Sequence, residues 1–183
     1  MRNIEKYVLK WEIISLFFVI IIGSFLHFLF EISGYFYPIG AISAVNESVW
    51  EHLKLGFWPI IFLAPVEYKF IKERGKNFIF AKTIAAYIIP LSIVIIFYTY
   101  TAILGTNLLI MDILTFIIAA IIGHVLSYQI MIYQEKPRIM TYISLILIIF
   151  LAILFVLFTY FPPKLPIFQD SLTGQYGITT HQH

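Results

Sequence analysis

Two histidines and three glutamates in the first third of the chain carry side chains that bind metals or transfer protons. His27 and Glu31 are four residues apart, which places them on one face of a helix. Glu47, Glu51 and His52 follow close together after a short break. Catalytic zinc commonly takes three His or carboxylate ligands and a water molecule. We therefore predict that these five residues form a catalytic acid–base or metal site. His27, Glu51 and His52 are the candidate ligands of a divalent metal such as zinc.

The spacing of these residues leaves a structural alternative open. Glu51-His52 lacks the second histidine of an HExxH motif, and the polar side chains could instead cap helix ends at the lipid headgroups. Glu47 and Glu51 are four residues apart on a predicted helix, where like charges repel. At the edge of a low-dielectric layer they need compensation by a proton, a metal, a histidine or the ammonium of Lys54.

Two further ionisable residues, Glu67 and His124, fall inside apolar segments, where such side chains are costly and often functional. With a rise of about 1.5 Å per residue, both reach the same half of the bilayer. We therefore expect them to approach each other. They would form either a buried polar pair that holds helices together or a proton relay.

The segments that must position these residues are long and apolar. Of 183 residues, 61% are hydrophobic and 12% are charged, against roughly 45–50% and about 25% in a soluble domain. Five apolar runs are long enough to cross about 30 Å of hydrocarbon as helices. They cover residues 11–32, 48–71, 83–104, 108–133 and 140–161. The sequence predicts an all-α, polytopic membrane helix bundle with five transmembrane helices, in a single domain of residues 1–183.

The distribution of basic residues predicts the orientation of these spans. Every Lys and Arg except Lys54 and Lys164 lies before the first span or near the second–third and fourth–fifth connections. Cytoplasmic loops carry an excess of Lys and Arg. We therefore expect a multi-pass protein of the cell membrane, with a cytoplasmic N-terminus and the C-terminus outside.

These spans should bring the candidate residues into one cavity. Gly23 lies one turn before His27, and small residues on that face let another helix approach closely. The first two spans are joined by a short loop and should be neighbours. We expect His27, Glu31, Glu51 and His52 to share a cavity that is open to the outside.

The outer tail, residues 162–183, should complete this cavity. As far as Ile178 it keeps aromatic and turn-forming residues together, whereas disordered tails are poor in such residues. We expect residues 166–178 to cover the cavity and to bring Asp170 near the two histidines, as a further catalytic candidate. Docking of the tail onto the headgroup layer is the alternative.

Several of these segments resemble a family of uncharacterised small multi-spanning bacterial membrane proteins. They are residues 26–31, 45–55, 98–105 and 162–178, and the string NESVWEHLKL at residues 46–55 is the most specific. The resemblance implies a multi-spanning membrane protein. It implies no activity, and so it transfers no catalytic role to any residue.

Composition narrows the function but leaves alternatives. The absence of cysteine excludes thiolate chemistry, and a net charge of +2 is too small to indicate a nucleic-acid partner, which leaves membrane lipid as the expected partner. The first hypothesis is a membrane-embedded, metal-dependent hydrolase or transferase that acts on lipid or a membrane peptide at the outer leaflet. The alternatives are a binding or transport protein for a small solute, ion or lipid, and an accessory subunit of a membrane complex.

Overall fold

The computed structural model describes residues 2–133 and 137–178, and it confirms the predicted all-α class. Gln134–Lys136 and the last part of the predicted tail, residues 179–183, lie outside the described residues. In the described part the chain forms five α-helices and two short 3₁₀ helices. These are α1 (Arg2–Ile32), η1 (Tyr37–Ala41), α2 (Val49–Ile71), α3 (Phe78–Leu104), α4 (Leu109–Ile132), α5 (Ile139–Tyr160) and η2 (Pro166–Phe168).

Each predicted span coincides with one helix, and the helix ends have local causes. The first helix begins nine residues earlier than expected, at Arg2 rather than residue 11, because neither Gly nor Pro interrupts the sequence before it. The Ser48 side chain caps α2 by accepting the Glu51 amide at 3.4 Å. Gly105 ends α3 in the left-handed conformation, with φ of 72°.

Four of the described helices are long and apolar enough to cross a membrane. They are α1 over Asn3–Ile32, α3, α4 and α5. The remaining one, α2, carries Glu51 and Lys54 near its start and Glu67 and Lys69 near its end. The four apolar helices fit a multi-pass membrane protein, as the composition indicated.

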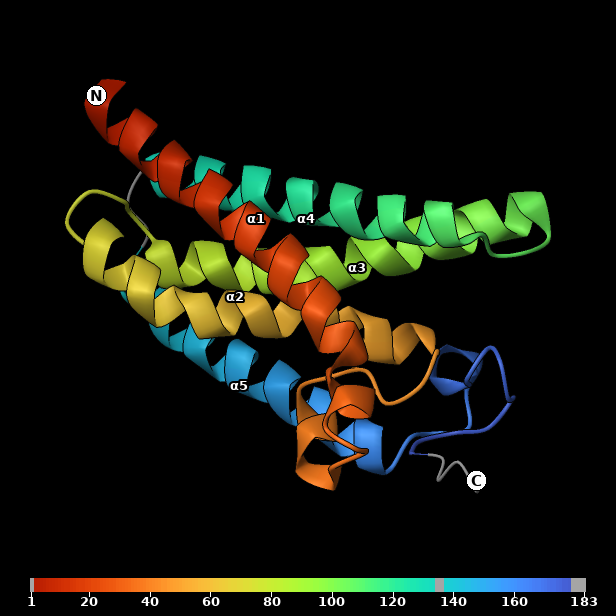
Figure 1. Cartoon of the computed structure of the whole chain (residues 1–183). Helices are drawn as coiled ribbons and strands as arrows, with labels where there is room; N and C mark the ends of the chain where they lie inside the picture. The colour runs from red at the N-terminus through yellow and green to blue at the C-terminus, as the bar shows by residue number, and fades with distance from the viewer. Residues whose placement is uncertain (1, 134–136, 179–183) are drawn as a thin grey trace.

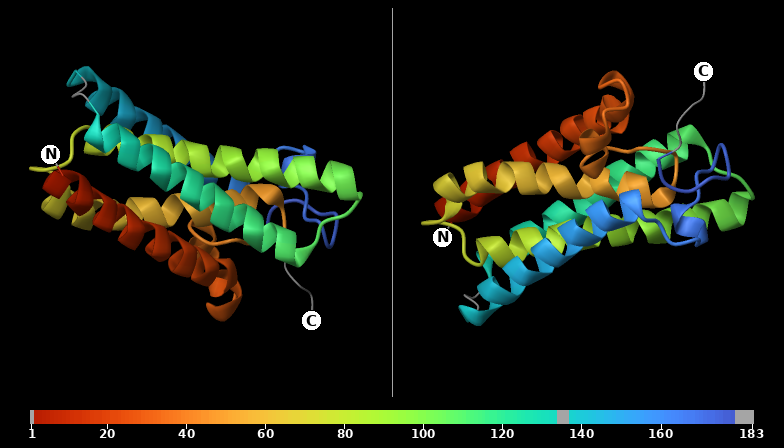
Figure 2. Two further views of the ribbon diagram at one scale, coloured as in Figure 1. Left: turned by 90° about the horizontal axis from the view of Figure 1, so that it is seen from above. Right: turned by 90° about the horizontal axis from the view of Figure 1, so that it is seen from below.

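The polar helix α2 has the charged side chains of Glu51, Lys54 and Glu67 buried against its neighbours. It packs against α1 on one side and α3 on the other, α4 contacts α1 and α3, and α5 contacts α3 (Figures 1 and 2). The outer faces are apolar, with Phe17 on α1 and Ile146 on α5 both exposed. Such faces are suited to lipid tails, whereas α2 keeps most of its charged groups away from them.

The connections gather at two ends of the bundle. At the N-terminal end lie the start of α1 and the loop between α2 and α3. At the C-terminal end lie residues 33–48, the turn between α3 and α4, and the tail after α5 (Figure 1). Residues 33–48 and the tail, which are far apart in the sequence, are therefore placed side by side.

Candidate metal site at the C-terminal end of the bundle

A close contact between α1 and α2 sets the position of both histidines. A Cβ atom built at Gly23 would lie 2.6 Å from the Leu55 carbonyl oxygen, so this approach requires glycine. His27 lies one turn beyond Gly23 on α1, and His52 lies three residues before Leu55 on α2. The two imidazoles consequently meet, with 3.1 Å between their Nε2 atoms.

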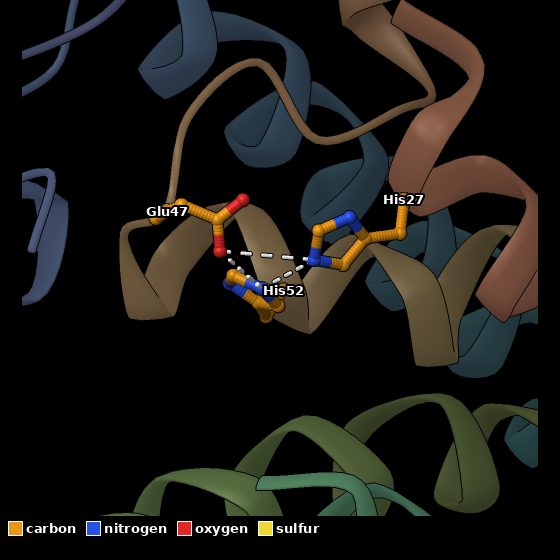
Figure 3. A group of neighbouring side chains, drawn as sticks. All are labelled: His27, Glu47 and His52. Atoms are coloured by element: carbon orange, nitrogen blue, oxygen red, sulfur yellow. Dashed lines mark hydrogen bonds and ion pairs between the residues drawn. The ribbon is translucent and has the colours of Figure 1, made fainter. Parts of the chain in front are cut away.

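Glu47 joins the histidines from the loop that precedes α2. Because α2 begins at Val49, Glu47 is not held on a helix face. Its Oε2 atom lies 3.4 Å from His52 Nε2 and 3.7 Å from His27 Nε2 (Figure 3). The Ser171 hydroxyl of the tail donates to the Glu47 carbonyl oxygen at 3.1 Å, which fixes the backbone there.

The three donor atoms form a triangle of the size that a metal ion requires. Their separations are 3.1, 3.4 and 3.7 Å. In a tetrahedral zinc site with bonds of about 2.0–2.1 Å, two ligand atoms are about 3.3 Å apart. His27, Glu47 and His52 therefore have the spacing of one face of such a tetrahedron, and they form a group that could hold a metal ion.

The hydrogen bonds around His52 orient its free nitrogen toward the triangle. His52 Nδ1 lies 2.8 Å from the Ser48 carbonyl oxygen, which can only accept, so Nδ1 carries a proton. Nε2 then carries a lone pair that can bind a metal when the ring is neutral, or a proton that it can donate to Glu47 when the ring is charged. A backbone contact of this kind is a common way to orient a metal-binding histidine. The triangle can therefore hold a shared cation, either a proton or a metal.

The electrostatics of Glu47 favour its charged form. The hydrogen bond with the His52 ring lowers the pKa of Glu47 below its ordinary value, and the nearby imidazoles of His52 and His27 act in the same direction. Partial burial opposes these effects without cancelling them. Glu47 is therefore ionised at neutral pH.

A pocket of about 260 Å³ opens beside the triangle. His27 and Glu47 line it, together with the Glu31 carboxylate and the rings of Phe28 and Tyr35. Glu31 thus lines the same pocket as His27, whereas His52, which was expected to share it, is not among its lining residues. The pocket also leaves open space next to the triangle.

The tail folds over this end of the bundle and contributes Asp170 to the pocket. The Phe168 ring packs on Trp50 of α2, with 4.8 Å between the ring centroids. The Asp170 carboxylate accepts the Leu172 amide at 3.0 Å and the Thr173 hydroxyl at 2.6 Å. Asp170 thus lines the same pocket as His27, while both of its oxygens hold the turn of the tail.

The structure places Glu51 away from the two histidines with which it was grouped. Its Oε2 atom lies 2.5 Å from Lys54 Nζ, and its Oε1 atom accepts the Thr159 hydroxyl at 2.9 Å. Consecutive helix residues point about 100° apart, so Glu51 faces the bundle interior while His52 faces α1. The two glutamates therefore have different partners for their negative charge. Lys54 pairs with Glu51, and the two histidines lie against Glu47.

Glu67 and His124 are both buried, but they do not form a direct polar pair. Within the described residues no hydrogen bond or ion pair joins them. Glu67 Oε1 instead accepts from Lys82 Nζ at 2.8 Å, and Lys82 also contacts Glu12 Oε1 at 2.9 Å. From the sequence, Lys82 was expected in the connection before the third span, which was predicted to begin at residue 83. The signal that could have identified this cluster was Glu12, an acid already inside the first predicted span.

Three comparisons with known proteins bear on the family of this chain. A search of the curated proteins and a search of the solved structures each gave no match. A family model matches residues 1–178, and its description is "Family of unknown function (DUF6512)". This match covers the four segments on which the resemblance rested, and the chain therefore belongs to the DUF6512 family.

Proposed function

We propose that this protein is an integral membrane metalloenzyme, a hydrolase in which His27, Glu47 and His52 bind zinc or a similar divalent cation. The observation that carries the proposal is the triangle of donor atoms, with sides of 3.1, 3.4 and 3.7 Å, beside an open pocket. Two histidines and a glutamate are a ligand set of hydrolytic zinc sites, which keep the fourth position open.

The residues around the triangle have roles that follow from their positions. A bound zinc would lower the pKa of a coordinated water to about 7, which supplies a nucleophile at neutral pH. Glu31 lines the same pocket as His27 and Glu47 and is the candidate general acid–base group. Ser48 holds the ring of His52 in the tautomer that binds metal.

The pocket favours a neutral or cationic substrate over a phosphate-bearing one. Its lining includes the carboxylates of Glu31, Glu47 and Asp170, and no Lys or Arg is among its described residues. Aromatic side chains, Phe28 and Tyr35 among them, supply the apolar part of the lining. A membrane peptide or the neutral part of a lipid at the outer leaflet fits this combination.

The proposal includes five membrane crossings with the N-terminus in the cytoplasm, in the cell membrane. Lys54 and Lys82 are buried in ion pairs, so neither contributes to the charge of a loop. The remaining basic residues keep the same asymmetry, with Lys164 alone on the C-terminal side. A reporter that is active only outside the cytoplasm should work when fused after His183. Its activity when fused after Lys76 would contradict the orientation.

Metal content of the purified protein tests the site directly. Protein in detergent, analysed by mass spectrometry of metals, should hold one divalent cation per chain. His27→Ala, Glu47→Gln and His52→Ala should each lose it, whereas His124→Gln, which removes a histidine remote from the triangle, should retain it. Equal metal content in all four variants would contradict the site.

A second measurement separates the hydrolase from other metal-binding functions. The wild type, metal-depleted wild type and Glu31→Gln should be compared on ester and peptide substrates presented in lipid vesicles. Hydrolysis should require the metal and should fall about 100-fold or more without a general acid–base group. A metal-loaded protein without hydrolysis of either class would instead favour the binding or transport alternative.

A further inference from the structure

A second set of buried ionisable groups lies near the N-terminal end of the bundle, away from the metal site. It joins four helices, since Glu12 lies on α1, Glu67 on α2, Lys82 on α3 and Ser127 on α4. Lys82 Nζ lies 2.9 Å from Glu12 Oε1 and 2.8 Å from Glu67 Oε1. The Ser127 hydroxyl donates to Glu12 Oε1 at 2.8 Å, and Ser15 Oγ lies 3.4 Å from Lys82 Nζ.

Three acceptor atoms of this region have no hydrogen-bond partner among the described residues. They are Glu12 Oε2, Glu67 Oε2 and His124 Nε2, and these residues are at most 4% exposed. His124 Nδ1 lies 2.8 Å from the Ala120 carbonyl oxygen and therefore carries the proton of the neutral ring. A buried acceptor without a donor is costly. The Ser15 hydroxyl, which accepts from Lys82, still has one proton to donate, so these acceptors outnumber the donors near them.

The cluster also carries more negative than positive charge. Two carboxylates face one ammonium, which leaves one negative charge in a region closed to water. The hydroxyls of Ser15 and Ser127 and the neutral ring of His124 do not cancel it. Uncompensated charge in a low-dielectric interior is normally removed by protonation. One added proton would cancel the charge and also supply a further donor.

We propose that the cluster of Glu12, Glu67 and Lys82 binds one exchangeable proton, as a protonation site inside the membrane that is independent of the metal site. Uptake forms one O–H bond at Oε2 of Glu12 or Glu67, with water at the N-terminal end as the source of the proton. Release breaks that bond and returns the proton to water. A metal cation fits less well, because the ammonium of Lys82 already lies between the two carboxylates and would repel it.

Infrared difference spectroscopy of the protein in lipid tests this proposal. The wild type at neutral pH should show the C=O band of one protonated carboxylic acid, and this band should shift in D₂O and disappear at alkaline pH. Glu67→Gln and Glu12→Gln should each abolish the band, because either variant leaves one carboxylate balanced by Lys82. The control Glu73→Gln, which removes an exposed carboxylate from the loop after α2, should retain it.

The use of two glutamine variants keeps the test decisive if one of them fails to fold. The absence of the band from the wild type would overturn the proposal. Its persistence in a folded Glu12→Gln or Glu67→Gln variant would also overturn it. A wild type without the band whose stability rises with sodium concentration would show that the cluster holds a metal cation rather than a proton.

Discussion

The two buried ion clusters of this protein use the same side chains but differ in charge balance. Near the C-terminal end, Lys54 faces one carboxylate, and its Nζ atom contacts Glu51, the Gly40 carbonyl and the Thr159 hydroxyl. Near the N-terminal end, Lys82 faces two carboxylates. An ammonium has three donors, so the first cluster is complete, whereas the second has acceptors in excess.

This difference in charge balance indicates a structural role for the Lys54 cluster and a functional role for the Lys82 cluster. The balanced cluster ties α2 to η1 and α5, because Gly40 lies in η1 and Thr159 in α5. The Val45 amide also donates to Glu51 at 3.1 Å, which anchors the loop that carries Glu47. The balanced cluster thus holds the loop of Glu47 in place, while the unbalanced one is the proposed protonation site.

The largest expected effect comes from removing one acid from each cluster. Glu51→Gln leaves Lys54 buried without a counter-charge and should lower the free energy of unfolding by about 3–5 kcal/mol. Glu67→Gln leaves a balanced pair and should cost less than about 1 kcal/mol. Unfolding by SDS in mixed micelles measures both. Equal losses would remove the distinction between the clusters.

A smaller effect is expected from the hydroxyl that links the balanced cluster to α5. Thr159→Val deprives Lys54 of an acceptor and Glu51 of a donor and should cost about 1–3 kcal/mol. Thr99→Val is the matched control, because both threonines also bond the carbonyl four residues earlier and Thr99 is exposed. Similar changes in the free energy of unfolding for the two variants would argue against a cooperative cluster.

The contact between α1 and α2 can be tested without changing any polar group. In Gly23→Ala the new methyl group meets the Leu55 carbonyl and the Phe116 ring, and the helices must separate at a cost of about 1–3 kcal/mol. The metal affinity should fall together with the stability, because the same contact positions His27 and His52. Ser24→Ala, on an exposed position of the same helix, should leave metal affinity unchanged, as measured by competition with a chelator.

The smallest effect is the pH dependence of metal binding. Free histidine has a pKa of about 6.5, so protons should displace the metal between about pH 7 and 5. Because the pKa of Glu47 is lowered, its stabilising charge persists through this range and is lost only as pH falls below the ordinary pKa of a glutamate. Glu47→Gln should therefore weaken metal binding without changing its pH slope, while His52→Ala should reduce the slope. An unchanged slope in His52→Ala would contradict its role as a ligand.

Much of the fold and part of the site could be predicted from the sequence. The helices follow from apolar runs and from the turn formers between them, which act locally. His27 and Glu31 reach one pocket because their spacing fixes a shared helix face. The burial of Glu12 and Lys82 could not be predicted, because both lie at the ends of predicted spans, where charged residues normally face water.

The sequence by itself determined the all-α class, the membrane character and the presence of acids and histidines at one end of the bundle. Those properties depend on composition and on helical periodicity. The tertiary structure decided that Glu47 rather than Glu51 meets the histidines, because α2 begins at Val49 and leaves Glu47 free to turn. It also decided that Lys82 lies between two acids from other helices, because such pairing depends on how the helices pack.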